Sequence, residues 1–64
     1  MDRALTCVII DDEPLAQHAL RQSLERLPSV RLLAAFANAL EASAGLSALN
    51  PDLIFLDIHL PEVS

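Results

Sequence analysis

The chain has 64 residues, 53% of them apolar, and its nine acidic residues against four arginines give a formal net charge of −5. A chain this short holds one small domain, and its apolar content excludes a disordered segment. It contains no lysine and has no basic patch that could neutralise phosphates, so this segment is not expected to bind nucleic acid.

The first expected element is a strand over residues 5–11. Its apolar residues include several β-branched ones and do not alternate with polar residues, which is typical of a strand buried on both faces. The single cysteine, Cys7, lies in this run and is expected to be a buried, inert thiol. Three acidic residues, Asp11, Asp12 and Glu13, end the apolar run.

A helix is predicted over residues 14–27. Pro14 suits its first position, where the missing N–H would have no partner anyway. Pro28 ends it, because the residue before a proline is disfavoured in the α region. The spacing places an apolar face opposite a polar one, and the apolar face consists of Ala16, Leu20, Leu24 and Leu27.

A second strand is predicted over residues 30–36 and a second helix over residues 39–49. Asn38 can cap this helix, with Glu41 three residues later in the capping-box position. Its alanines make it thin enough to lie close to a sheet, and Asn50-Pro51 ends it. The spacing favours one apolar stripe made of Leu40, Ala44 and Ala48.

A third apolar strand over residues 52–57 completes a βαβαβ order. Strands joined by helical crossovers are parallel, and such connections are almost always right-handed. The sequence therefore predicts an α/β domain with a three-stranded parallel sheet, covering residues 1–64.

Two of these strands, the first and the third, end in aspartate. Ligands of open parallel sheets bind at the carboxyl ends of the strands, so Asp11, Asp12 and Asp57 should converge if the two strands are neighbours. Carboxylates held close together repel one another, which favours a shared hard cation, Mg²⁺ above all. Taken alone, Asp11 and Asp12 could instead solvate a loop or favour the start of the first helix.

Two segments resemble the receiver domains of response regulators, especially those of the LytTR (LytR/AlgR-like) group. Residues 8–16, VIIDDEPLA, are similar to the opening of these domains, and residues 51–61, PDLIFLDIHLP, to their phosphoacceptor segment. The spacing between the two segments also agrees. The resemblance implies a flavodoxin-like (CheY-like) doubly wound sheet, of which this chain would be the N-terminal half, truncated after the third strand.

The resemblance implies a role for each matching residue. Asp57 would be the phosphoacceptor, which attacks the phosphohistidine of a sensor histidine kinase to form an acyl phosphate. Asp11 and Asp12 would hold Mg²⁺, with Asp12 as the more direct ligand, and the main-chain carbonyl of His59 would complete the metal site. Pro61 would shape the following turn. The chain would be a phosphoacceptor and not an enzyme.

The family also uses a Ser or Thr and a Lys at the ends of two further strands, and this chain stops at Ser64 before either. Phosphotransfer by this segment alone is therefore expected to be impaired. In the family's strand order the third strand would be an exposed edge here, which predicts self-association through it. DNA would be bound only through an output domain that this segment lacks.

The same residues admit other interpretations. A degenerate receiver kept as a phosphate-independent dimerisation module is the main alternative. A dehalogenase nucleophile needs a second aspartate where His59 stands, and a Walker B acid needs a glycine-rich loop, whereas the only glycine is Gly45. Residues 18–26 are a candidate kinase-docking surface. With no signal peptide and no apolar run of about 20 residues, a cytoplasmic protein that does not enter membranes is expected.

Overall fold

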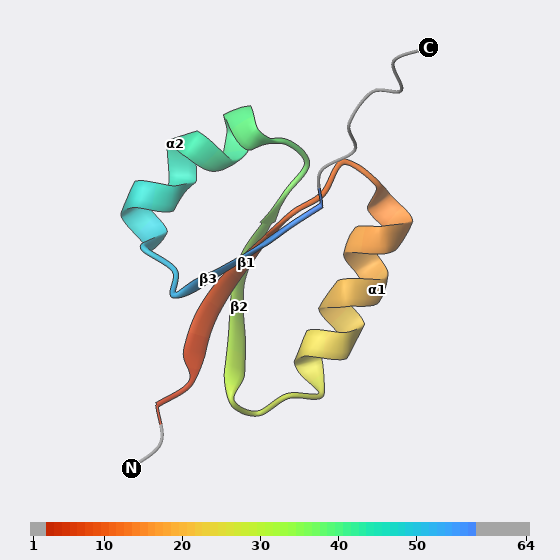
Figure 1. Ribbon diagram of the computed structural model, residues 1–64, viewed down its shortest axis with the longest axis vertical. Coiled ribbons are helices and arrows are strands. Elements are labelled where there is room, and N and C mark those ends of the chain that lie inside the picture. Colours follow the sequence, from red (N-terminus) through yellow and green to blue (C-terminus); the bar gives the residue numbers. More distant parts are fainter. Residues whose placement is uncertain (1–2, 58–64) are drawn as a thin grey trace.

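The computed structural model describes residues 3–57 and contains three parallel strands and two helices. The sheet order is β2-β1-β3, so β1 is the central strand. In Figure 1 the two helices lie on either side of the sheet. The predicted parallel βαβαβ fold is confirmed. Its elements in chain order are β1 (Leu5–Ile10), α1 (Pro14–Glu25), β2 (Val30–Phe36), α2 (Ala39–Leu49) and β3 (Leu53–Leu56).

The core is centred on β1, which pairs with a strand on each side. Cys7, Val8 and Ile9 are completely buried, and Ile10 nearly so. A strand covered on both faces has no solvent side, which explains the absence of alternating polar residues in its sequence. Burial also raises the pKa of the Cys7 thiol above its ordinary value, because it disfavours the thiolate.

The first helix packs its apolar face on the sheet and ends earlier than the sequence predicts. Leu24 is buried, and Leu20 packs against the core cluster. The helix ends at Glu25, not at residue 27, because the amides of Arg26 and Leu27 bond three residues back, to the carbonyls of Ser23 and Leu24. This tighter turn leaves Leu27 outside the helix, before Pro28, and exposed.

The second helix is capped at both ends by asparagine. The Asn38 side chain accepts a hydrogen bond of 2.8 Å from the Glu41 amide. The Asn38 side-chain amide also lies 3.5 Å from a Glu41 carboxylate oxygen. At the other end Asn50 adopts the left-handed conformation, with φ 46°, and its amide bonds to the Leu46 carbonyl.

The predicted apolar stripe of α2 is wrong. Leu40, Ala44 and Ala48 are exposed, and Leu40 retains 83% of its accessible surface. The residue buried against the rest of the fold is Ala42, with Leu46 half-buried. Alanine, leucine or glycine occurs on every side of this helix, so the spacing of its apolar residues does not indicate which face is buried. The buried face is set by the position of the sheet against which the helix packs.

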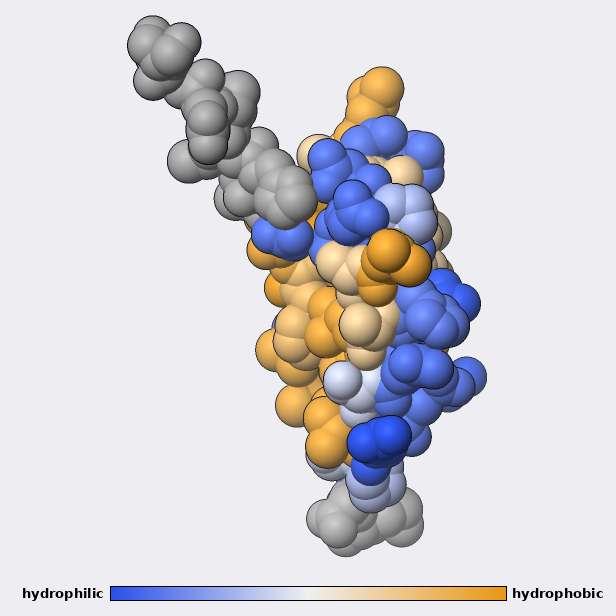
Figure 2. All heavy atoms as spheres, turned by 90° about the vertical axis from the view of Figure 1, so that its right-hand side faces the viewer, coloured by the Kyte–Doolittle hydropathy of each residue, from blue (hydrophilic) through white to orange (hydrophobic). Residues whose placement is uncertain are grey.

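Large apolar side chains also remain exposed on β3, namely Leu53, Ile54 and Leu56. Figure 2 shows apolar residues as a band along one side of the molecule, beside a side that is mostly polar. Within residues 3–57, neither helix is long and apolar enough to cross a membrane.

Candidate functional site

Backbone hydrogen bonds hold the three strand ends at the same level. The Asp57 amide donates to the Ile10 carbonyl at 3.1 Å, and the Asp11 amide donates to the Phe36 carbonyl at 3.0 Å. The interstrand hydrogen bonding of β1 and β3 thus continues for one residue beyond Ile10 and Leu56, the last residues of these strands. The consequence is that the acidic residues following β1 and β3 start from adjacent points on one edge of the sheet (Figure 1).

Asp11 is the buried member of the acidic group, with 6% of its surface exposed. Its Oδ1 accepts a hydrogen bond of 2.9 Å from the Glu13 amide, which closes a turn between β1 and α1. This bond satisfies one carboxylate oxygen inside the protein, as the burial of a charged group requires. Asp12 and Asp57 are exposed.

A hollow of about 220 Å³ is lined by all three aspartates. The backbone around it comes from the ends of β1 and β3 and from the start of α2, and its lining is Ile10, Asp11, Asp12, Ala37, Asn38, Ala39, Leu56 and Asp57. A second hollow, of about 210 Å³, is lined by Asp11 and Asp57 without Asp12. The fold therefore brings Asp11, Asp12 and Asp57 together, although they come from opposite ends of the chain.

Carboxylate oxygens are hard ligands and suit Mg²⁺ better than a soft metal. Within residues 3–57, however, no group of three or more His, Cys, Asp or Glu side chains is arranged closely enough to enclose a metal. A cation that takes one or two carboxylates and keeps its waters fits this arrangement, whereas a dehydrated, fully enclosed ion does not. His59, the remaining predicted ligand, lies outside the described residues, as does Pro61.

One residue near this edge could not be singled out from the sequence. Gln17, in the first turn of α1, donates from its side-chain amide to two backbone carbonyls, those of Asp11 and Phe36. A glutamine on a helix is ordinary in a sequence, and no motif singles it out. Only the fold places it across the ends of β1 and β2.

The opposite end of the sheet carries a second polar cluster that the sequence did not indicate. Asp52 Oδ2 accepts hydrogen bonds from the Thr6 amide at 2.8 Å and the Thr6 hydroxyl at 3.0 Å. The Asp52 amide in turn donates to the Thr6 hydroxyl at 3.1 Å. The two hydrogen bonds that Asp52 Oδ2 accepts from Thr6, with a smaller effect from Arg3 3.8 Å away, hold the pKa of Asp52 below its ordinary value. We call this pair the Thr6–Asp52 clip.

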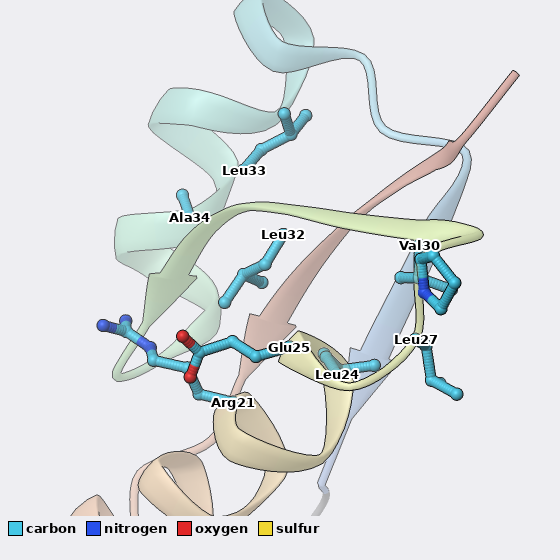
Figure 3. A pocket seen from close by; sticks show the side chains of 9 residues that line it. Arg21, Leu24, Glu25, Leu27, Val30, Leu32, Leu33 and Ala34 are labelled. Carbon is cyan, nitrogen blue, oxygen red and sulfur yellow. The ribbon is translucent and has the colours of Figure 1, made fainter.

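A larger hollow, of about 470 Å³, lies between α1 and β2 (Figure 3). Its lining is mostly apolar and includes Leu24 and Leu32, with Arg21 and Glu25 projecting side by side from α1. None of the three aspartates lines it. Its size therefore does not identify it as the chemical site, because the three clustered aspartates lie at the other hollows.

Comparisons with known proteins agree on one family. The sequence profile of the response regulator receiver domain matches residues 7–64. The transcriptional regulatory protein BtsR of Salmonella typhi is 42% identical over 57 residues, which are 89% of this chain and 24% of BtsR. An uncharacterized response regulatory protein of Shewanella oneidensis is 37% identical over 60 residues, which are 94% of this chain and 25% of that protein.

A solved structure has the same fold. RcsB from Salmonella enterica serovar Typhimurium, bound to promoter rprA in the presence of phosphomimetic BeF3−, superposes with a TM-score of 0.84. The identity is 24%, so this likeness concerns the fold alone, and it covers 92% of this chain and 29% of RcsB. The chain spans about a quarter of the length of the curated relatives it matches.

Proposed function

The chain belongs to the response regulator receiver domain family, and from this premise we propose that Asp57 accepts a phosphoryl group from a sensor histidine kinase. One observation carries the proposal: the hydrogen bond of 3.1 Å from the Asp57 amide to the Ile10 carbonyl, which keeps Asp57 beside the acidic pair after β1. Receiver domains are generally phosphoacceptors and not enzymes, so the transfer ends on the protein's own carboxylate.

The proposed step exchanges one bond to phosphorus for another. A carboxylate oxygen of Asp57 bonds to phosphorus, and the bond between phosphorus and the imidazole nitrogen of the donor histidine breaks. The electron pair of that bond stays on the imidazole nitrogen, which takes up a proton. The exposure of Asp57 supports this role, since the donor histidine belongs to a second protein and must reach the carboxylate.

Receiver domains generally bind Mg²⁺ at the phosphorylation site, and we extend this to Asp11, Asp12 and Asp57. Exposed Asp12 is the proposed direct ligand, whereas buried Asp11, with one oxygen already bonded to the Glu13 amide, would act through water. The main-chain carbonyl of His59 is proposed as a further ligand. When bound, the cation neutralises charge on the transferring phosphoryl group.

The experiment that tests the phosphoacceptor is intact-mass spectrometry of the full-length protein after incubation with acetyl phosphate and Mg²⁺. We expect a gain of one phosphoryl group, lost in Asp57→Asn and retained in Glu25→Gln, which removes the same charge from the far end of α1. A phosphoryl group that persists in Asp57→Asn would contradict the assignment.

The whole protein's role rests on further proposals. Because BtsR is named a transcriptional regulatory protein, we propose that this protein controls transcription, with DNA bound by an output domain. The comparisons do not support any one group within the family, so membership of the LytTR group stays a proposal from residues 8–16 and 51–61.

We also propose that the kinase docks beside residues 18–26. A cytoplasmic location belongs to the same proposal, since the buried Cys7 thiol would stay reduced there.

Self-association of the 64-residue chain is a separate proposal. Among residues 3–57, β3 pairs with β1 on one side only, and Leu53, Ile54 and Leu56 are exposed on it. An apolar strand with an open edge is suited to pairing with a second copy. Light scattering of the isolated chain at micromolar concentration should give a mass above that of the monomer, and a stable monomer would refute it.

The phosphate-independent dimerisation module is not favoured. Three carboxylates around one hollow repel each other and bring nothing to a surface used only for pairing. They are useful where a cation and a phosphoryl group bind.

A further inference from the structure

Gln17 connects three elements at the site. It lies in the first turn of α1 and is half-buried. Its Nε2 donates to the Asp11 carbonyl at 3.3 Å and to the Phe36 carbonyl at 3.2 Å. A single side-chain amide therefore joins α1 to the carboxyl ends of both β1 and β2.

Both acceptors restrain the backbone of Asp11. The Asp11 carbonyl belongs to the peptide group that joins Asp11 to Asp12, so fixing it fixes the plane from which the Asp12 backbone continues. The Phe36 carbonyl also accepts from the Asp11 amide, at 3.0 Å. Asp11 is thus held at its amide, at its carbonyl and, through the Glu13 amide, at its carboxylate.

The chemistry of the contact is specific to an amide of this length. Both acceptors are carbonyl oxygens, so the bridging group must supply two N–H donors, which the glutamine NH₂ does. Methionine has the same length and no donor. Glutamate has the same length but, when ionised, would turn a carboxylate toward two carbonyl oxygens and toward the acidic pair.

We infer that Gln17 is a positioning residue for the cation site: its amide fixes the Asp11–Asp12 peptide so that the Asp12 carboxylate is held at the hollow shared with Asp57. The inference rests on the proposed function. Gln17 touches neither the cation nor the phosphoryl group and acts only through the backbone of the acidic pair.

If Gln17 has this role, its substitution should weaken Mg²⁺ binding and leave the rate of phosphorylation at saturating Mg²⁺ nearly unchanged. In Gln17→Met, the Mg²⁺ concentration for half-maximal phosphorylation of Asp57 by acetyl phosphate should rise about tenfold, the lower end of what residues supporting metal ligands contribute. The rate at saturating Mg²⁺ should stay near that of the wild type, because a high cation concentration compensates for a poorly held ligand. In the metal-free protein, NMR should show the Asp12 and Glu13 amide signals displaced.

Gln22 provides a matched control, since it is an exposed glutamine on the same helix, and Gln22→Met should leave the Mg²⁺ requirement unchanged. Gln17→Glu at neutral pH is the second variant and should raise the requirement at least as much. Titration calorimetry of the full-length variants with Mg²⁺ gives the affinity independently of phosphorylation.

The inference is overturned if Gln17→Met or Gln17→Glu loses stability while its Mg²⁺ affinity matches that of the wild type, since the contact would then serve folding alone. Failure of the proposed function looks different, because the wild type itself would then bind no Mg²⁺ or gain no phosphoryl group.

Discussion

The backbone amide of Asp57 lies 3.1 Å from the carbonyl oxygen of Ile10 and donates a hydrogen bond to it. This bond fixes the residue after β3 next to the residue before Asp11. It uses only main-chain atoms, so a substitution of the Asp57 side chain leaves it intact. The charge at the site can therefore be changed without releasing the strand that carries it.

Removing the Asp57 charge should change the free energy of unfolding through electrostatics alone, because the substitution leaves the fold intact. In the absence of Mg²⁺, Asp57→Asn should raise the free energy of unfolding slightly, by no more than about 1 kcal/mol, because it relieves repulsion among carboxylates lining one hollow. Glu25→Gln removes an equal charge elsewhere and should have less effect. Urea unfolding at low ionic strength measures both, and a clear loss of stability in Asp57→Asn would argue against mutual repulsion.

Mg²⁺ should stabilise the wild type through linkage, and the two aspartates of the acidic pair should differ. Asp12→Asn is expected to raise the Mg²⁺ dissociation constant by about tenfold, equivalent to about 1.4 kcal/mol, because exposed Asp12 is the proposed direct ligand. Asp11→Asn keeps the Oδ1 acceptor for the Glu13 amide and should weaken binding less. Thermal unfolding with and without Mg²⁺ tests this order. Equal losses in the two variants would contradict it.

Much of this fold follows from the sequence because its local signals and its tertiary structure agree. The apolar run of β1 matches a strand buried on both faces, and Asn38 supplies the cap that its residue type suggests. The convergence of Asp11 and Asp57 follows from strand order alone. Parallel pairing brings the carboxyl ends of adjacent strands to one edge.

The unpredicted features depend on three-dimensional placement. The buried face of α2 could not be read from apolar spacing, because apolar residues surround that helix and Leu40 turns outward. Gln17 and Thr6 belong to residue types that are common on surfaces. Their partners are backbone carbonyls or a residue distant in sequence, which only the register of the strands brings within reach.

The Thr6–Asp52 clip should make the free energy of unfolding depend on pH in the acidic range. The folded-state pKa of Asp52 lies below its unfolded value of about 3.9. The clip therefore stabilises the protein at pH above about 3.9, and this contribution is lost as pH falls through the lower, folded-state pKa. Asp52→Asn should flatten this part of the acid unfolding profile. Thr6→Val should flatten it only partly, because the Thr6 amide still donates to the carboxylate.

Urea unfolding from about pH 6 to about pH 3 measures the effect. Thr6→Ser is the control, since it keeps the hydroxyl that donates to Asp52. An unchanged pH profile in Asp52→Asn would show that the ionisation of Asp52 does not contribute to the pH dependence of folding.

Gly45 allows α2 to approach the ring of Phe36. A Cβ at this position would lie 3.0 Å from Phe36 Cζ and 3.3 Å from Cε1. Alanine in a helix is normally better than glycine by about 1 kcal/mol. We expect Gly45→Ala to gain less than about 0.5 kcal/mol, because the close contact offsets the helix propensity.

A double-mutant cycle with Phe36→Leu tests this contact, since the full gain should reappear where the ring is absent. The same gain in both backgrounds would show that the ring moves aside without resistance. Chemical denaturation of the four proteins of the cycle gives the coupling free energy.

Truncation of Leu24 should destabilise the fold much more than truncation of Leu40, although both are leucines on helices. Leu24 is 4% exposed and belongs to the core cluster with Cys7 and Ile9, whereas Leu40 is 83% exposed. Leu24→Ala should cost about 2–5 kcal/mol, because it removes buried contacts and leaves a cavity. Leu40→Ala should stay within about 0.5 kcal/mol of the wild type, since little surface is uncovered. Circular dichroism during urea unfolding compares them, and a large loss in Leu40→Ala would mean that α2 faces the sheet through its Leu40 stripe after all.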